Sequence, residues 1–505
     1  MTLILKMNTL DKNTKQITIL GGGTAGWLSA LSMVKKYPTF NITLIESEDI
    51  GIIGAGEGSV PFLLHFLEKL ELNIDFNELI SETNGTHKIG INFENWNGDN
   101  KNYFHDFFNG SRTIKELEPI NYIGYLLSNN INIDDHSISN KFALNDKSPI
   151  GLDGFKYCSY ALHFDAHLFA NYLKKIASKL NVIRIEGIAT DFILNDNNDV
   201  CKLKLQTGEL IDTDFVFDCS GFSRNIIGNL YKTKWISYMD KLRINSAFPF
   251  NIPQSKKEIK PYTIARAMEY GWLWQIPLQN RWGCGYLFDD TLIDIDAIKK
   301  ELESHFGFSI ESNKVIKFEA GRYENVWVNN CIAIGLSSGF TEPLEATSIL
   351  LSLISLNELQ SIQLFNTDSS KVSAYNIKIS KCNDEIVDFL QLHYITKRNQ
   401  NEFWKWYNDN KNISSNLSNI LDSLKNANDL KLDSESIFTP HSWFTVAKGL
   451  DVINDSAFIE KFESHEYKES KQSHYDWYNL ETNKLLNQTQ SELHYLNNIK
   501  LRKYD

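Results

Sequence analysis

A glycine-rich turn near the start of the chain has the spacing that dinucleotide-binding proteins use. Gly21, Gly23 and Gly26 form a G-x-G-x-x-G pattern, which follows a short apolar strand predicted over 16–20 and opens an apolar helix predicted over 27–36. The first glycine permits a tight turn, the second lets the backbone approach a pyrophosphate, and the third lets helix and strand pack closely. Free N–H groups at the helix start favour the phosphates. The pattern therefore predicts a dinucleotide, and the alternative is a glycine turn in an unrelated α/β protein.

An acidic residue and two turns of small residues are predicted to complete this site. Glu46 ends the next predicted strand, at 41–46, where a carboxylate can bind a ribose hydroxyl. A strand is also predicted before Asp218, and the Cys-Ser-Gly sequence that follows allows close backbone approach to a cofactor. The glycine-rich loop 54–61 is placed to reach over the same ligand. The alternatives are a plain strand-ending turn at 217–222 and a flexible loop at 54–61.

A pair of tryptophans marks a later strand. Trp272 and Trp274 lie two residues apart in the sequence Gly-Trp-Leu-Trp-Gln-Ile-Pro. Side chains at positions i and i+2 of a strand point to the same face, so this pair predicts an aromatic wall that ends at Pro277. The alternative is a core strand that happens to carry two large side chains.

The overall composition excludes several classes of function. A chain of 505 residues with 42% hydrophobic residues can bury a large core. Its net charge of −12 argues against nucleic acid as the main partner, because phosphate binding needs a basic face. The six cysteines show neither a C-x-x-C pair nor metal-ligand spacing, so we expect no metal and reduced thiols in a cytoplasmic protein. No apolar run approaches the ~18 residues of a membrane span.

The order of predicted elements indicates an α/β protein with a parallel sheet. A strand-helix-strand unit opens the chain, antiparallel strands are expected within 182–217, and helical composition begins near residue 344. This order predicts a cofactor-binding core whose first part is 1–96, an irregular excursion on the substrate side at 97–160, the rest of the core with the tryptophan strand at 161–350, and a helical substrate-side region at 351–505.

Taken in order, these motifs resemble the flavin-dependent halogenases of the tryptophan halogenase family. The resemblance runs from about residue 17 to 450. It rests on the segments 21–26, 54–61, 87–96, 161–166, 217–222, 271–277, 335–349, 389–394 and 403–404. It implies a Rossmann-type FAD-binding core related to the flavin monooxygenases, covered on the substrate side by a mostly helical region. One departure is Gly58, where alanine is more usual.

The resemblance assigns the reaction to a lysine and a glutamate. Lys88 begins the sequence Lys-Ile-Gly-Ile-Asn-Phe-Glu-Asn-Trp and would receive hypohalous acid, as a hydrogen-bonded species or as a haloamine. A buried amine has a lowered pKa, which makes its neutral form accessible. Glu345 would polarise hypohalous acid or take the ring proton. The alternatives are a solvated lysine at a strand start and a carboxylate that interacts with a helix dipole.

The same resemblance places the halide and the tryptophan wall. Thr347 and Ser348 fall where the family binds halide through backbone N–H groups, although Ser348 stands where many members have glycine. The family's tryptophan motif, with Trp272, Trp274 and Pro277, lies near the flavin and keeps organic substrate away from it. Aromatic bulk suits this role because it excludes water and packs rigidly.

The cofactor implied is FAD, used as FADH2 and supplied by a separate flavin reductase. Its predicted contacts are Gly21, Gly23, Thr24, Ala25, Gly26, Glu46, Gly56, Ser59, Ala189, Asp218, Gly335, Leu336 and Ile349. The other partners are oxygen, a halide (chloride, bromide or iodide) and a small electron-rich aromatic of the indole or phenol type. Free tryptophan is not expected, because the tyrosine pair that grips it in the family is absent. A homodimer is one candidate assembly.

Two other functions remain open at this point. A flavin monooxygenase that hydroxylates an aromatic would usually carry a D-G sequence for the nicotinamide and a G-D near the ribityl chain. The corresponding sequences here are Asp-Cys-Ser-Gly at 218–221 and Gly-Leu at 335–336. A flavin-binding protein without turnover would not need Lys88 and Glu345.

Overall fold

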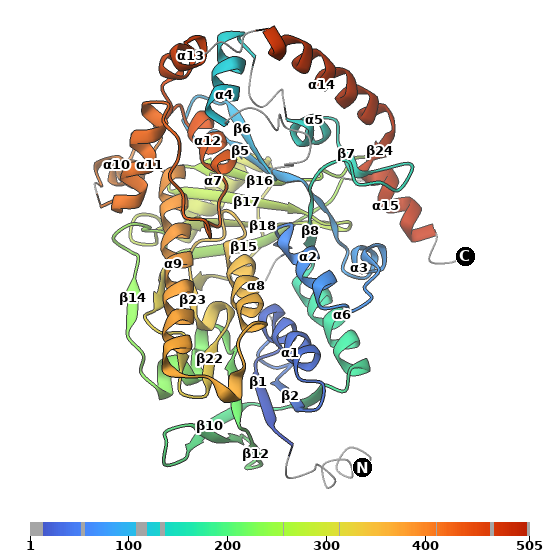
Figure 1. Ribbon diagram of the computed structural model, residues 1–505, viewed down its shortest axis with the longest axis vertical. Coiled ribbons are helices and arrows are strands. Elements are labelled where there is room, and N and C mark those ends of the chain that lie inside the picture. The colour runs from blue at the N-terminus through green and yellow to red at the C-terminus, as the bar shows by residue number, and fades with distance from the viewer. Residues whose placement is uncertain are drawn as a thin grey trace.

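The structure is a computed structural model of the 505-residue chain, shown in Figure 1. It describes residues 14–51, 56–107, 119–131, 137–255, 257–312, 314–410, 412–464 and 469–501. Gly54 and Ala55, in the second predicted glycine-rich loop, lie outside the described residues.

A six-stranded sheet forms the lower part of the molecule in Figure 1. Its order is β21-β22-β13-β1-β2-β9, and β22, β13, β1, β2 and β9 run parallel. These strands are β1 (Gln16–Leu20), β2 (Asn41–Glu46), β9 (Ile183–Glu186), β13 (Phe215–Asp218), β21 (Trp327–Val328) and β22 (Cys331–Ala333). The predicted parallel sheet is confirmed. The antiparallel pairing predicted near 182–217 is found between the strands that follow β9, but it is wrong for β9 and β13, which run parallel to their neighbours in this sheet.

A seven-stranded sheet lies above the first, in the middle of Figure 1. Its order is β19-β15-β18-β17-β16-β5-β6, with the tryptophan strand β17 at the centre. The strands are β5 (Gly90–Glu94), β6 (Asn102–Asp106), β15 (Ser246–Pro253), β16 (Thr263–Met268), β17 (Gly271–Pro277), β18 (Arg281–Phe288) and β19 (Ile316–Lys317).

Four smaller sheets complete the strands. One of them carries Lys88 on an edge strand, in the order β3-β8-β4. Their members are β3 (Glu57–Gly58), β4 (Thr86–Lys88) and β8 (Ala161–Phe164); β10 (Ala189–Leu194), β11 (Val200–Leu205) and β12 (Leu210–Asp212); β14 (Trp235–Ser237), β20 (Gly321–Tyr323) and β23 (Gly339–Phe340); and β7 (Lys147–Gly151) with β24 (Thr489–Ser491).

Helices cover both sheets and dominate the C-terminal part, as the composition predicts. They are α1 (Thr24–Lys36), α2 (Phe62–Lys69), α3 (Phe76–Glu82), α4 (Pro119–Ser128), α5 (Ile138–Leu144), α6 (Ala166–Lys179), α7 (Ile295–Phe306), α8 (Thr347–Leu359), α9 (Ser369–His393), α10 (Glu402–Asp409), α11 (Ser415–Lys425), α12 (Pro440–Gly449), α13 (Asp455–Glu463), α14 (Glu469–Asn487) and α15 (Glu492–Leu501). Aspartates cap several of them; the Asp165 carboxylate, for example, accepts from two N–H groups at the start of α6.

The described parts of segment 97–160 are more regular than predicted. Strand β6 pairs with β5 along its whole length, and α4, α5 and β7 follow. The polar, asparagine-rich composition hid these elements, because Tyr103, Phe104 and His105 are buried between polar neighbours. Strand β6 thus forms one edge of the seven-stranded sheet.

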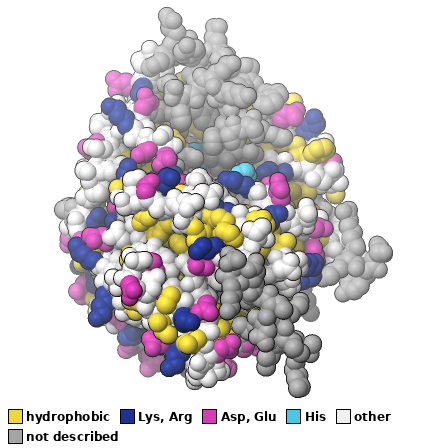
Figure 2. All heavy atoms as spheres, turned by 60° about the horizontal axis from the view of Figure 1, so that its bottom comes forward, with side chains coloured by type: hydrophobic (Ala, Val, Ile, Leu, Met, Phe, Trp, Pro, Cys, Tyr) yellow, Lys and Arg dark blue, Asp and Glu magenta, His cyan; other side chains and the backbone are white. Residues whose placement is uncertain are grey.

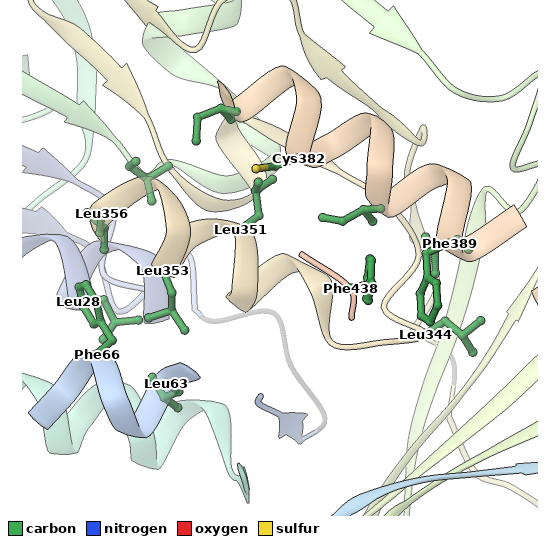
Figure 3. Packing of buried hydrophobic residues seen from close by; sticks show 14 of the residues in the cluster. Leu28, Leu63, Phe66, Leu344, Leu351, Leu353, Leu356, Cys382, Phe389 and Phe438 are labelled. Carbon is green, nitrogen blue, oxygen red and sulfur yellow. The ribbon is translucent and has the colours of Figure 1, made fainter. Parts of the chain in front are cut away.

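Helix α8 is packed between two layers of helices, as Figure 3 shows. Leu353 and Leu356 face α1 and α2, whereas Leu351 lies toward Cys382 of α9. The C-terminal end of α8 is bound by Lys36, whose ammonium donates to the carbonyl oxygens of residues 359, 360 and 362. Such a cation satisfies carbonyls that the helix leaves free and complements its dipole. Helix α8 is therefore fixed at one end while its N-terminus faces the site.

The face shown in Figure 2 carries Lys, Arg, Asp and Glu side chains interspersed around a central group of hydrophobic side chains. Among the described residues, no helix combines the length and apolar composition that a membrane crossing requires.

Candidate active site

A cavity of about 660 Å³ lies where the parallel strands β1, β2 and β13 end. Ligands of doubly wound sheets bind at this edge. The structure brings most of the predicted cofactor contacts together in the cavity wall, namely Gly21, Gly23, Thr24, Ala25, Glu46, Ala189, Gly335, Leu336 and Ile349.

The glycines of the first turn fit a dinucleotide for separate reasons. Gly21 has a φ of +118°, and a Cβ there would lie 2.1 Å from the carbonyl oxygen of Cys219. A Cβ on Gly26 would lie 1.9 Å from the Gly21 oxygen. A Cβ on Gly23 would meet no protein atom within 4 Å. Protein packing thus requires glycine at two positions, whereas the open side of Gly23 leaves room for a pyrophosphate against the helix start.

Three predicted cofactor contacts have other partners. Asp218 lies outside the walls of both cavities described here, because its carboxylate accepts from Ser220 and from the N–H groups of Ile226 and Ile227. The hydroxyl of Ser59 donates to the carbonyl of Leu162. Glu46 does line the cavity, but one of its oxygens is ion-paired with Arg184 at 2.5 Å. Asp218 and Ser59 therefore shape the site from behind its walls.

A second cavity of about 550 Å³ adjoins the first. The two share Glu57, Phe222, Leu336, Ser348 and Ile349 in their walls, so together they suit an elongated dinucleotide with a ring system at one end. Gly56, Lys88, Trp272 and Trp274 also line the second cavity. Sequence reasoning gave no role to Glu57, which lies at the junction, where burial raises the pKa of its carboxyl to about 7.

The tryptophan wall has the predicted geometry. Trp272 and Trp274 project from the same face of β17 into the second cavity, with ring centroids 6.3 Å apart. Trp274 packs directly over Gly285 of β18, where a Cβ would lie 2.0 Å from the indole. Pro277 lies outside the cavity wall, and its carbonyl accepts from Thr86 on the strand that carries Lys88. The wall and the lysine strand are thus joined directly.

Lys88 is buried, at 1% exposure, and its side chain reaches the second cavity. The ammonium donates to the carbonyl oxygen of Ser59 at 3.0 Å and lies 5.4 Å from the ring centre of Phe107. Burial lowers the pKa of Lys88 to about 8, although the Glu345 carboxylate opposes this shift. A sizeable neutral fraction is therefore accessible near neutral pH, which a solvated lysine would not offer.

Glu345 is held by two histidines that sequence reasoning did not assign. Its Oε1 lies 2.9 Å from Nδ1 of His105 on β6 and 3.0 Å from Nε2 of His393 at the end of α9. Nδ1 of His393 also lies 2.8 Å from the carbonyl oxygen of Phe389, so both ring nitrogens face acceptors. Burial alone would raise the pKa of Glu345, but the two histidines outweigh burial and lower it to about 2. Glu345 is a permanent carboxylate at working pH.

Aromatic side chains surround this carboxylate on the side of the C-terminal helices. Phe389 stacks on Phe438 at 3.8 Å and packs edge to face with Trp443 at 4.9 Å; Figure 3 shows Phe389 and Phe438 beside Leu344. The Nε2 atom of His105, which is also buried, has no hydrogen-bond partner within the described part of the chain. Phe389 lies in segment 389–394, which carries part of the family resemblance, but sequence reasoning gave this ring no role.

The start of α8 presents free backbone N–H groups. Ala346, at the cap, has a φ of 57°, and no side chain caps the helix. Ser348 lines both cavities, and its hydroxyl has no hydrogen-bond partner among the described residues, whereas Thr347 is buried behind the wall. Uncapped N–H groups and a hydroxyl donor suit an anion.

Glu342, close to Glu345 in sequence, has a different environment. It accepts from the Tyr394 hydroxyl at 2.6 Å, and burial raises the pKa of its carboxyl to about 8. Two nearby carboxyls are therefore held in opposite protonation states at neutral pH.

Comparison with known proteins identifies the family. A family model described as tryptophan halogenase matches residues 16–460. The chain belongs to the tryptophan halogenase family.

Named relatives agree with this assignment. The tryptophan 7-halogenase RebH of Lentzea aerocolonigenes is 31% identical over 429 residues, which cover 77% of this chain and 78% of RebH. The tryptophan 6-halogenase ThaL of Streptomyces albogriseolus is 30% identical over 426 residues, covering 78% and 79%.

Two solved structures extend the likeness to the fold. Tar14, a tryptophan C-6 flavin-dependent halogenase from taromycin biosynthesis, superposes with a TM-score of 0.87 at 26% identity, over 96% of this chain and 100% of that one. Xcc4156, a flavin-dependent halogenase from Xanthomonas campestris, superposes with a TM-score of 0.84 at 26% identity, over 96% of this chain and 98% of that one. The predicted fold, the FAD-dependent halogenase class and the family are confirmed.

The glycine turn gives a matched pair of variants. Gly23→Ala adds a methyl group that meets no protein atom, so we expect a thermal midpoint close to wild type but FAD affinity reduced by about 10-fold or more, since the methyl would occupy the predicted pyrophosphate site. Gly21→Ala should instead destabilise the protein, because of its positive φ and the contact with Cys219. Calorimetric FAD titration and thermal unfolding test both; unchanged FAD affinity in Gly23→Ala would refute the assigned site.

The buried ammonium of Lys88 predicts a pH-dependent stability. Its folded pKa is about 8 and its ordinary value 10.5, so the protonated form destabilises the fold below pH 8, and this cost fades as pH rises from 8 to 10.5. Lys88→Met should therefore raise the free energy of unfolding by up to roughly 3 kcal/mol at pH 6.5 and by progressively less above pH 8. Denaturant unfolding at several pH values measures this, with the exposed Lys101→Met as control. A gain that does not depend on pH would contradict the account.

Proposed function

We propose that this halogenase replaces a ring hydrogen of an electron-rich aromatic by halogen, with Lys88 as the relay and Glu345 as its anionic partner. Bound reduced FAD would supply two electrons and two protons, so that oxygen, halide and one further proton give hypohalous acid and water. Hypohalous acid and the aromatic then give the aryl halide and water. The observation that carries the proposal is a buried lysine in the cavity wall, with a pKa near 8, electrostatically coupled to a permanent carboxylate.

Lys88 is suited to receive hypohalous acid because it reaches the second cavity from a fixed position. Its bond to the Ser59 carbonyl orients the ammonium, and the neighbouring Phe107 ring excludes water from one side. The neutral amine can bond to the halogen and release hydroxide, which a proton converts to water. The protonated amine can only donate a hydrogen bond to hypohalous acid. The lowered pKa favours the first form more than an ordinary lysine would.

Glu345 is suited to stabilise positive charge rather than to act as a base tuned near neutral pH. Its pKa of about 2 makes it a weak base toward ordinary groups. The halogenated ring intermediate is cationic and a strong acid, so even this carboxylate can accept its proton. His105 and His393 keep the carboxylate ionised and oriented throughout.

The substrate proposed is an indole- or phenol-type aromatic. Buried aromatic rings back this site: Phe389 packs against His105 and His393, the two partners of Glu345, and also against Phe438 and Trp443. The named relatives act on tryptophan, whereas this sequence lacks the tyrosine pair by which the family holds the free amino acid. A separate flavin reductase, a cytoplasmic location and a homodimer stay predictions.

Removal of the lysine tests the proposal. Lys88→Met should lower halogenated product by at least 100-fold while oxidation of reduced FAD by oxygen continues at a similar rate, because the relay is lost after the oxidant forms. Product by mass spectrometry and oxygen uptake are measured together, with Lys101→Met as control. Halogenation by Lys88→Met at the wild-type rate would refute the relay.

The serine at the start of α8 predicts a halide effect. Wild type, given equal chloride and bromide, should form mainly brominated product, because bromide is the easier to oxidise. Ser348→Ala removes one donor from the proposed anion site, so the halide KM should rise about 2- to 10-fold with little change at saturating halide. The exposed Ser361→Ala serves as control. An unchanged halide KM would count against this site, and mainly chlorinated product would contradict the expected halide preference.

A further inference from the structure

The last helix of the chain places a buried carboxylate against the strand that carries Lys88. Glu492, the first residue of α15, is fully buried, and its Oε1 accepts from the backbone N–H of His87 at 2.9 Å. Its Oε2 lies 2.9 Å from Nδ1 of the same histidine. A single carboxylate thus binds both the main chain and the side chain of the residue before Lys88, from 405 positions away in the sequence.

The surroundings of this pair hold it in one geometry. The imidazole of His87 packs against the rings of Tyr160 and Tyr495, with centroid distances of 4.9 and 4.8 Å. The Tyr495 hydroxyl donates to Asn77 of α3. The backbone N–H of Glu492 donates to the carbonyl of Asp146, next to the pairing of β24 with β7. Helix α15 is therefore anchored on several elements, and Glu492 has little freedom to move.

The position of β4 makes this contact important for Lys88. β4 is an edge strand that pairs with β8 on one side only, and the N–H of His87 on the other side is bound by Glu492. Side chains alternate along a strand, so His87 points to α15 while Lys88 points to the cavity. A shift of His87 would move the lysine with it and disturb its bond to Ser59.

We propose that Glu492 is a positioning residue: by binding His87 it fixes edge strand β4 and so sets the place of the Lys88 amine between the second cavity and Glu345. The inference rests on the relay proposed for Lys88. Stability alone does not require such a contact, because apolar residues of similar volume often serve as well as a buried polar pair. Glu492 also lies beyond residues 16–460, to which the family match extends.

The test compares Glu492→Ala and Glu492→Gln with wild type, with the exposed His494→Ala on the same helix as control. The measured quantity is coupling, the amount of halogenated product per reduced FAD oxidised. In Glu492→Ala we expect coupling to fall about 10- to 100-fold while flavin oxidation is unchanged, since small misplacements of a reacting group have effects of this size. Glu492→Gln can still accept from the His87 N–H, so its coupling should be intermediate. His494→Ala should match wild type.

A second measurement does not need flavin. Amide hydrogen exchange in the flavin-free protein should be faster at residues 86–89 in Glu492→Ala, with β1 and β2 unaffected.

The outcomes separate two failures. The positioning role is wrong if Glu492→Ala keeps wild-type coupling while Lys88→Met loses it. It is also wrong if Glu492→Ala lowers halogenated product and flavin oxidation in the same proportion, because coupling is then unchanged. If Lys88→Met itself keeps coupling, the relay is wrong. Should Glu492→Ala not fold, Glu492→Gln decides: coupling below wild type supports the role and wild-type coupling overturns it.

Discussion

The site depends on two buried ionisable groups, Lys88 and Glu345, whose pKa values are both lowered, so that the lysine moves toward its neutral form while the glutamate stays charged. Burial would make both Lys88 and Glu345 neutral, but only the lysine shifts that way, because His105 and His393 hold the glutamate as a carboxylate. The result is an amine close to its neutral form beside a fixed negative charge. An amine that accepts a halogen and an anion that stabilises a cationic ring are the two groups that the proposed chemistry needs.

The architecture holds these charges from separate elements. Lys88 comes from edge strand β4, His105 from β6, His393 from the end of α9 and Glu345 from the turn before α8. Helix α8 links the two sides: its start contributes Ser348 to both cavities, and its far end is bound by Lys36, the last residue of α1, the helix that follows the dinucleotide turn. Because α8 is packed between two layers of helices and bound at its far end, it fixes the position of the two cavities relative to the Glu345 carboxylate.

The parts of the site that could be predicted are those that one short segment determines. In the turn that begins at Gly21, the positive φ of Gly21 and the close contact between Gly21 and Gly26 are both determined within six residues, and the common face of Trp272 and Trp274 follows from strand alternation. Lys88 and Glu345 were predicted because their flanking motifs resemble a known family, and the structure places both in buried positions.

The parts that were missed join distant segments. His105 is 240 positions from Glu345, and Glu492 is 405 positions from His87. No pattern within one short segment could therefore predict either contact. Asp218 is the opposite case: its motif is local and was recognised, and the structure adds that its carboxylate accepts hydrogen bonds from N–H groups of the segment after β13. The asparagine-rich composition of 97–160 likewise concealed β6, whose burial depends on pairing with β5.

The most direct test of the central claim is the identity of the product that wild-type protein forms. Reduced FAD, oxygen and a small set of indoles and phenols are supplied with bromide, and then without halide, and the products are analysed by mass spectrometry. The account predicts an aromatic in which one hydrogen is replaced by bromine, and no organic product without halide although flavin is still oxidised. A hydroxylated aromatic that forms equally with and without halide would contradict it.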